Sequence, residues 1–336
     1  MFRLSRRSWT LLGLGLSALL LTWAFWNVDL HEIGAVMLSA DPLLLLAVVV
    51  LCILSLVVRG WRWQQLVCAA EAVPAKTVIL ATLVGHLANN LLPARSGEVV
   101  RLIVLGRKAQ LSKTTLLGTL VLDHAIEGAG LVLIMAALPS LFATPGWLLT
   151  VTVSLASVTL GFLVLGTAVL VLASTGGAQR LPIPAHWAAR LDHGVRKFGV
   201  GFAALRKPHR LLASFAIGML SWLIQGGMVA LCLRATHLPL DFEHALFVLA
   251  AINVAVLIPG APSGVGPFEV AAVMALGAFG VAKAPGLSFG LLYHFIQILP
   301  TLAVGFAAIP ALGLTLKDLA PGAAAPTDLS SGRSGD

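Results

Sequence analysis

Charged residues are scarce in this chain. Only 11% of its 336 residues are Asp, Glu, Lys or Arg, whereas 58% are hydrophobic, and the mean hydropathy is +0.96. Soluble domains carry about a quarter charged residues, so this composition excludes an ordinary soluble protein. Apolar segments of about 20 residues recur along the whole length, which predicts an integral membrane protein that crosses the bilayer repeatedly as helices.

Cysteine pairs and cofactor motifs are also lacking. Cys52, Cys68 and Cys232 show no paired spacing, which predicts neither a disulfide nor a metal site. No nucleophile motif, phosphate-binding P-loop or dinucleotide fingerprint occurs. We therefore expect no cofactor, no metal and no enzymatic activity. Because an ATP-binding motif is missing as well, directional transport would have to use a gradient, a partner or mass action.

Two kinds of apolar segment can be distinguished by length. Two shorter pairs, each interrupted by Pro and Gly, are 77–92 with 97–105 and 245–258 with 267–281. Their arms are too short for the roughly 30 Å hydrocarbon core, which favours re-entrant helical hairpins. The sequence thus predicts an all-α polytopic membrane protein with an inverted repeat: two hairpins of opposite orientation and about six full spans. The expected spans are Trp9–Val28, Leu43–Val67, Thr114–Leu138, Trp147–Ala173, Leu211–Leu233 and Pro285–Leu314.

Basic residues are distributed unevenly among the loops. Placing the N-terminus in the cytoplasm puts most Lys and Arg on the cytoplasmic side, as the positive-inside rule requires. This predicts a multi-pass protein of the bacterial cytoplasmic membrane, and the net charge of +8 does not indicate nucleic-acid binding. We expect one transmembrane domain, 1–319, with a basic cytoplasmic loop, 174–210, that contacts anionic lipids as an interfacial helix. Residues 320–336 are expected to be disordered.

The two hairpin tips resemble each other. The first reads "NNLLPARSGEVVR" from Asn89 and the second "NVAVLIPGAPSGVGPFEV" from Asn253. Each places Asn, then Pro, then Ser-Gly before a Glu-Val that opens a new helix. Paired broken segments of opposite orientation are typical of transporters with a binding site near the bilayer midplane. Helix N-termini at both tips favour an anionic group such as a phosphate.

These tips supply the predicted substrate-binding residues, which are Asn89, Asn90, Arg95, Glu98, Arg101, Asn253, Ser263 and Glu269. Two structural alternatives stay open. Glu98 and Glu269 are also suitable acids for the first turn of a helix. Glu98 and Arg101, three residues apart, are also suited to a purely structural ion pair.

Further polar residues lie within the expected spans. Asp123 and Glu127 share a helix face, so repulsion would favour protonation of one of them. With His124 or His294 they form a candidate proton- or substrate-coupling site, and hydrogen bonding between helices is the alternative. Arg59 and Arg62 lie near a helix end and are interpreted as extending toward the membrane surface; a lipid-phosphate contact is the alternative.

At these residues the chain resembles the lysylphosphatidylglycerol synthase transmembrane family of flippase-like membrane proteins. The resemblance runs from Leu43 to about Leu314 and includes "RGWRWQQLV", "NNLLPARSGEVVRLIVL" and "IPGAPSGVGPFEVA", which is similar to a P-G-x-x-G-x-x-E signature. It implies movement of lipids or isoprenoid-linked lipids between leaflets. We expect a unit without the soluble aminoacyltransferase domain of bifunctional relatives. His124 and His294 stand where many relatives resemble Arg, which counts against a generic anionic phospholipid.

The sequence therefore favours translocation of a lipid or lipid-linked intermediate. Two alternatives remain. The chain could be a non-catalytic subunit or scaffold that serves a membrane enzyme of glycolipid or isoprenoid-lipid synthesis. Less favoured is a membrane enzyme that modifies a lipid head group, with Asp123 and Glu127 as acid and base.

Overall fold

A computed structural model describes residues 6–92, 96–175, 185–257 and 262–316, without the side chains of 6–12 and 185–191. Within these residues helices are the only regular secondary structure. This confirms the predicted all-α class. Arg95 and the tail at 320–336 lie outside the described residues. The α-helices are α1 (Arg6–Phe25), α2 (Leu30–Ser39), α3 (Pro42–Ala70), α4 (Ala75–Leu91), α5 (Gly97–Ala109), α6 (Lys113–Ala137), α7 (Gly146–Thr175), α8 (Ala185–Val200), α9 (Pro208–Ala235), α10 (Phe242–Ala255), α11 (Pro267–Gly277) and α12 (Lys283–Ala311).

Five described helices are long and apolar enough to cross a bilayer: α3, α6, α7, α9 and α12. They correspond to five of the six predicted spans, and local signals set several of their ends. Asp41 caps α3 through the backbone N–H of Leu43, with Pro42 in the first turn. Ser112 caps α6 through the N–H of Thr115. Both arrangements satisfy helix N–H groups that have no partner within the helix.

The first predicted span differs from a simple crossing. The chain turns by 86° between Gly13–Phe25 of α1 and Leu30–Ser39 of α2, and α2 was not predicted. Asn27 has a positive φ of 54° at this turn. The ammonium of Lys283 donates to the carbonyl oxygens of Trp23 and Trp26 at 2.7 and 2.9 Å. It thereby satisfies carbonyls at the end of α1 and fixes the corner.

The first interrupted pair forms a helical hairpin, α4 and α5, as predicted. These helices have 17 and 13 residues, or about 26 and 20 Å at 1.5 Å per residue, so each is shorter than the hydrocarbon core. The arms cross closely, because a Cβ on Gly97 would overlap the carbonyl oxygen of Gly85. Only glycine at position 97 allows this approach.

The second interrupted pair forms the hairpin of α10 and α11, also as predicted. Its arms have 14 and 11 residues. The 3-10 turn η4 (Pro262–Gly264) and Gly266, whose φ is +97°, precede α11. That backbone conformation favours glycine, and Pro267 then occupies the first turn of α11.

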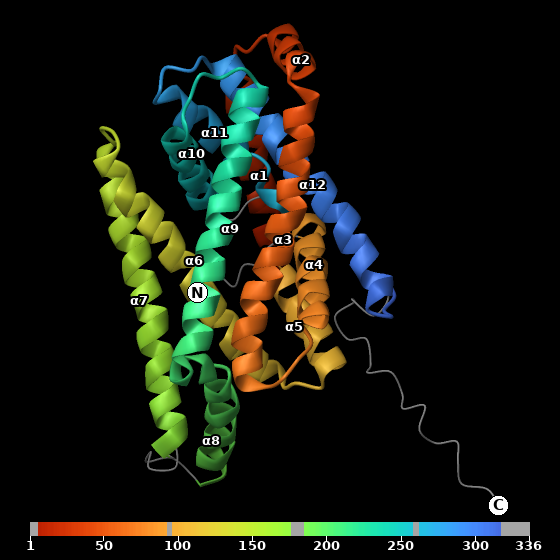
Figure 1. Cartoon of the computed structure of the whole chain (residues 1–336), viewed down its shortest axis with the longest axis vertical. Coiled ribbons are helices and arrows are strands. Elements are labelled where there is room, and N and C mark those ends of the chain that lie inside the picture. Colours follow the sequence, from red (N-terminus) through yellow and green to blue (C-terminus); the bar gives the residue numbers. More distant parts are fainter. Residues whose placement is uncertain (1–5, 93–95, 176–184, 258–261, 317–336) are drawn as a thin grey trace, which may run out of the picture.

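The two hairpins lie at opposite halves of the bundle and meet between them (Figure 1). α10 and α11 occupy the half nearest α2, and α4 and α5 the half nearest α8. α4 contacts η4, so the tips touch. α12 packs on both α4 and α11, and this long helix therefore supports both hairpins.

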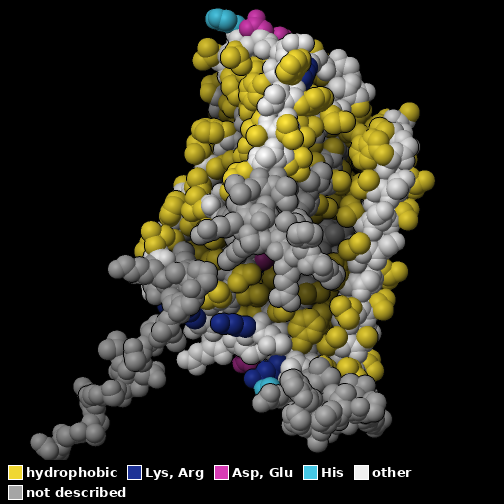
Figure 2. Space-filling view, turned by 180° about the vertical axis from the view of Figure 1, so that it is seen from behind, with side chains coloured by type: hydrophobic (Ala, Val, Ile, Leu, Met, Phe, Trp, Pro, Cys, Tyr) yellow, Lys and Arg dark blue, Asp and Glu magenta, His cyan; other side chains and the backbone are white. Residues whose placement is uncertain are grey.

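The predicted loop at 174–210 contains a helix. α8 packs against α6 and α7, and Phe202, completely buried, anchors the segment that follows. Figure 2 shows hydrophobic side chains over much of the visible flank, with most of the visible Lys and Arg side chains toward the end opposite α2. This is the surface expected of a multi-pass membrane protein whose two ends differ in charge.

Candidate functional site

An ion-paired cluster lies where α3, α5 and α6 face one another. Its centre is Arg62 of α3, whose Nε lies 2.8 Å from Oδ1 of Asp123. Nη2 of the same arginine lies 3.2 Å from Oε2 of Glu127. One guanidinium thus joins the two carboxylates that α6 presents on one face.

Arg101 of α5 connects the hairpin to this cluster. Its Nη2 lies 2.6 Å from Oε2 of Glu98 and 3.5 Å from Oδ2 of Asp123. Its guanidinium carbon lies 4.7 Å from the centroid of the Trp63 ring, a cation–π arrangement. The structural alternative for Glu98 and Arg101, an ion pair along one helix, is therefore present, and it extends to a second carboxylate.

The inner part of the cluster is buried, and its outer rim is more exposed. The side chains of Arg62, Asp123 and Arg101 are 3%, 0% and 7% exposed. Four others form the rim, and their exposures identify the groups that a ligand can reach. They are Arg59 at 21%, Glu127 at 23%, Glu98 at 27% and His124 at 44%.

Contacts within the rim tie these four side chains together. Arg59 lies 3.3 Å from Glu127 and donates to Gln225 of α9 at 2.9 Å. The ring of His124 stands between two carboxylates, with Nε2 3.4 Å from Glu98 and Nδ1 3.8 Å from Glu127. The rim can therefore offer both hydrogen-bond donors and acceptors to a polar group.

Asn89 organises the tip of the first hairpin. Its side-chain oxygen accepts from the backbone N–H of Gly97 at 2.8 Å, and its amide nitrogen lies 3.4 Å from Glu98. Ser96, the residue before α5, makes no side-chain capping bond. Asn89 instead satisfies the first N–H of the helix, so part of the predicted anion site is occupied by the protein itself.

A second cluster holds the tip of the other hairpin. The carboxylate of Glu269 accepts from the N–H of Gly266 at 2.7 Å and lies 2.6 Å from Nδ1 of His294. The other ring nitrogen of His294 lies 3.2 Å from the carbonyl oxygen of Ser263, and Phe268 stacks on the ring at 4.0 Å. Glu269, 3% exposed, has the helix-capping geometry of the structural alternative.

The predicted tip residues are brought together only in part. Ser263 reaches Asn90, its Oγ lying 3.2 Å from the side-chain oxygen and 3.3 Å from the carbonyl oxygen. Asn253 donates to the carbonyl of Leu249 in its own helix at 2.8 Å. Glu98 and Glu269 belong to different clusters. Their predicted roles in substrate binding stay predictions.

Arg59 and Arg62 were misjudged from the sequence. Their position near a helix end favoured extension to the membrane surface, but Arg62 is 2% exposed. It turns inward because Asp123 and Glu127 offer it two carboxylates. For the same reason the repulsion expected between these two acids is offset, because each lies beside a guanidinium group. Two arginines on one apolar helix and two acids on another were the feature of the sequence that could have predicted this pairing.

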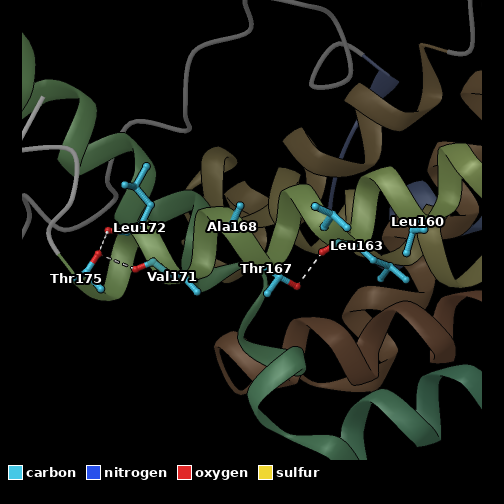
Figure 3. Close-up of a pocket in the computed structure, with 8 residues that line it drawn as sticks. Leu160, Leu163, Thr167, Ala168, Val171, Leu172 and Thr175 are labelled. Atoms are coloured by element: carbon cyan, nitrogen blue, oxygen red, sulfur yellow. Dashed lines mark hydrogen bonds between the residues drawn. The ribbon is translucent and has the colours of Figure 1, made fainter.

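An apolar groove of about 690 Å³ runs along the outer face of α7 (Figure 3). Leu160, Leu163 and Val171 line it, and the hydroxyls of Thr167 and Thr175 bond to carbonyls of their own helix. None of its lining residues is titratable. The groove is separate from the charged cluster, since no residue of the cluster lines it.

One group of potential metal ligands exists among the described residues. Asp241, Glu243 and His244 have ligand atoms within 4.8 Å of one another at the start of α10. The backbone N–H of Asp241 donates to Nδ1 of His244 at 3.3 Å. This bond places His244 as part of a helix cap, and ordinary helix capping explains the arrangement.

Comparison with known sequences decides the family. The family model for the lysylphosphatidylglycerol synthase transmembrane region matches residues 10–305. The chain belongs to this family. The match includes α3, both hairpins and most of α12, and it confirms the resemblance that the hairpin motifs indicated. The protein is thus a multi-pass, lipid-related membrane protein.

A curated relative adds a correction. The chain is 24% identical over 349 residues to a protein named glycosyltransferase AglD from Haloferax volcanii, with 94% of this chain and 56% of the relative aligned. The chain spans about half the length of that relative. The prediction of no enzymatic activity is contradicted by this match, because a protein aligned along nearly the whole chain is named for glycosyl transfer. Missing soluble-enzyme motifs were therefore an unsafe basis for that prediction.

Proposed function

We propose that this protein moves a membrane lipid, or a lipid-linked intermediate such as an isoprenoid-linked lipid, between the leaflets of a bacterial cytoplasmic membrane. The observation that carries the proposal is the cluster of Arg59 and Arg62 on α3 and Asp123 and Glu127 on α6, both spanning helices, joined by Arg101 of the hairpin arm α5. Charged groups at membrane depth are costly, and they mark substrate or ion pathways more often than simple packing.

The hairpins give this cluster a route to both leaflets. Paired broken helices that approach from opposite sides are the arrangement in which transporters place a midplane site. Here the open rim of the cluster adjoins the tip of the first hairpin through Asn89 and Glu98. The head group would lose its hydration water and form hydrogen bonds with the donors and acceptors of the rim, while the tails stay in the lipid.

Charge distribution supports an orientation. The end of the bundle that bears the turns around the first hairpin carries Lys76, Lys108 and Lys113, all exposed. The positive-inside rule places this end in the cytoplasm, together with the N-terminus. α8, with Arg196 and Lys197 exposed near its end, would then lie on anionic lipids. A membrane enzyme that supplies or consumes the lipid is a fitting partner.

Reconstitution tests the proposal. Purified protein in vesicles should accelerate exchange of a fluorescent lipid between leaflets, measured as loss of fluorescence to an impermeant reductant. Arg59→Gln and Glu98→Gln should slow exchange at least about tenfold, since each removes a charged rim group. Thr167→Ala in the α7 groove is the matched control and should keep the full rate. Exchange no faster than in protein-free vesicles would refute the proposal.

A second candidate is glycosyl transfer to or from a membrane lipid, and the glycosyltransferase relative favours it. In that case Glu127, whose carboxylate belongs to the exposed rim, would assist a proton transfer at the lipid acceptor. Incubation of the vesicles with radiolabelled nucleotide sugars and polyprenyl phosphate tests it. Label recovered in the lipid fraction would support transfer, and its absence across several sugars would count against it.

A further inference from the structure

The charges of the cluster cancel within the described part of the chain. Three guanidinium groups, from Arg59, Arg62 and Arg101, face three carboxylates, from Glu98, Asp123 and Glu127. His124 stands between two of these carboxylates. Protonation of its ring would add one positive charge beside two negative ones.

The accessible part of the cluster is not cationic. Glu98 and Glu127 are each about a quarter exposed, whereas Arg62 and Arg101 are almost completely buried. The rim also carries Arg59, at 21%, and His124, at 44%, and its two carboxylates leave it without a net positive charge whether the ring of His124 is neutral or protonated. Repulsion by like charges is poorly screened away from water. The exposed charges therefore disfavour the phosphate-like ligand that the helix N-termini alone would indicate.

One buried donor in the cluster has no partner. Nε of Arg101 is buried and makes no hydrogen bond to any described residue, although Nη2 of the same side chain contacts Glu98 and Asp123. A buried N–H without a partner is costly. An oxygen acceptor supplied by a ligand would satisfy it.

From these observations we propose that the cluster receives an uncharged, hydroxyl-rich head group, which means a glycosyl or polyol group on a lipid. The proposal rests on the lipid-handling function given above and specifies its substrate class. A hydroxyl donates one hydrogen bond and accepts others. It can donate to Glu98 or Glu127 while it accepts from Arg59, so a neutral polyol matches both signs of the rim at once. A hydroxyl oxygen that reached deeper would satisfy Nε of Arg101.

A comparison of lipids that carry the same acyl chains but different head groups tests this proposal. Vesicles contain the protein and one fluorescent lipid: glucosyl-diacylglycerol, phosphatidylglycerol or phosphatidylcholine. We expect glucosyl-diacylglycerol to exchange at least about tenfold faster than phosphatidylglycerol, because the anion is repelled. Native mass spectrometry of the purified protein, with equal amounts of these lipids, should show the same preference in binding.

Charge-removing variants sharpen the test. Glu127→Gln and Glu98→Gln keep the shape of the side chain and leave the cluster with one excess positive charge. Each should shift the ratio of phosphatidylglycerol to glucosyl-diacylglycerol binding upward by about tenfold. Two variants are used so that misfolding of one, detected by thermal unfolding, leaves the other as the test.

The outcomes separate this proposal from the proposed function. Selective binding of the glycosyl lipid without any exchange would support the substrate class and refute translocation. Preferred binding or exchange of phosphatidylglycerol by the unmodified protein would overturn the substrate class and leave translocation standing. An unchanged lipid preference in a folded variant would also overturn it, because charge balance would then not govern selection.

Discussion

The hydroxyl oxygen of Ser263 lies 3.2 Å from the side-chain oxygen of Asn90, and this contact joins the tips of two hairpins that come from opposite ends of the bundle. The two residues are 173 positions apart. Ser263 also offers its carbonyl oxygen to His294, so one residue links α4, η4 and α12. We expect this link to hold the tips together.

Replacement of Ser263 by Ala should loosen that link. One hydrogen bond contributes about 1 kcal/mol, so backbone amides on both sides of the two tips should exchange with deuterium up to about fivefold faster. Ser288→Ala is the matched control, since Ser288 is buried but bonds only to Ala284 of its own helix. Equal exchange in the two variants would show that the contact between the tips contributes nothing.

Asp123→Ala should be strongly destabilising. It leaves Arg62 buried with one fewer carboxylate, and breaking a buried ion pair in this way costs about 3–5 kcal/mol. The double variant Arg62→Leu/Asp123→Leu should recover part of that loss, as measured by thermal unfolding in detergent. Arg196→Ala removes a more exposed pair with Asp192 and should cost about 0–1 kcal/mol. If the double variant lost as much stability as Arg62→Leu and Asp123→Leu together, the pairing would be contradicted.

Gly97→Ala should prevent closure of the first hairpin. The added methyl group would overlap the carbonyl oxygen of Gly85, and backbone cannot move aside as a flexible side chain can. Overpacking of this kind costs about 1–3 kcal/mol or more. The matched control is Gly161→Ala on α7, where a Cβ meets nothing within 4 Å. A normal melting temperature for Gly97→Ala would show that the arms do not pack so closely.

Glu269→Gln should act on the second tip and not directly on a bound head group. The carboxylate already serves the N–H of Gly266 and the ring of His294. We expect about 1–3 kcal/mol of destabilisation, and His294→Gln should add little to it, because both variants remove the same contact. Thermal unfolding of the two single variants and the double variant measures the coupling. A coupling near zero would argue for independent roles.

Several elements could be predicted from local pattern alone. Five spans follow from runs of apolar residues, as in the stretch that became α3, because a helix of sufficient length satisfies its own backbone groups in lipid. The hairpins follow from Pro and Gly between two short arms. The 86° turn between α1 and α2 could not be predicted, since Lys283, which fixes it, comes from the distant start of α12.

The candidate site was harder to predict. Asp123 and Glu127 were identified because ionisable residues within a span are conspicuous, and Arg101 was identified as part of the first hairpin tip. Arg59 and Arg62 were interpreted as surface arginines, since a position near a helix end does not show which way a long side chain turns. The partner that decides, Asp123, is 61 residues from Arg62, and that distance in sequence hides the pairing.

By itself the sequence determined that the chain is a helical membrane protein with two broken segments, because hydropathy, proline and glycine act locally on the backbone. Only the tertiary structure decided which charges meet. The packing of α6 against α3 and α5 brings three guanidinium groups and three carboxylates together, and their cancellation is a property of the assembled cluster. Electrostatic energy depends on distances between side chains, and in this fold those distances are set by contacts among separate helices.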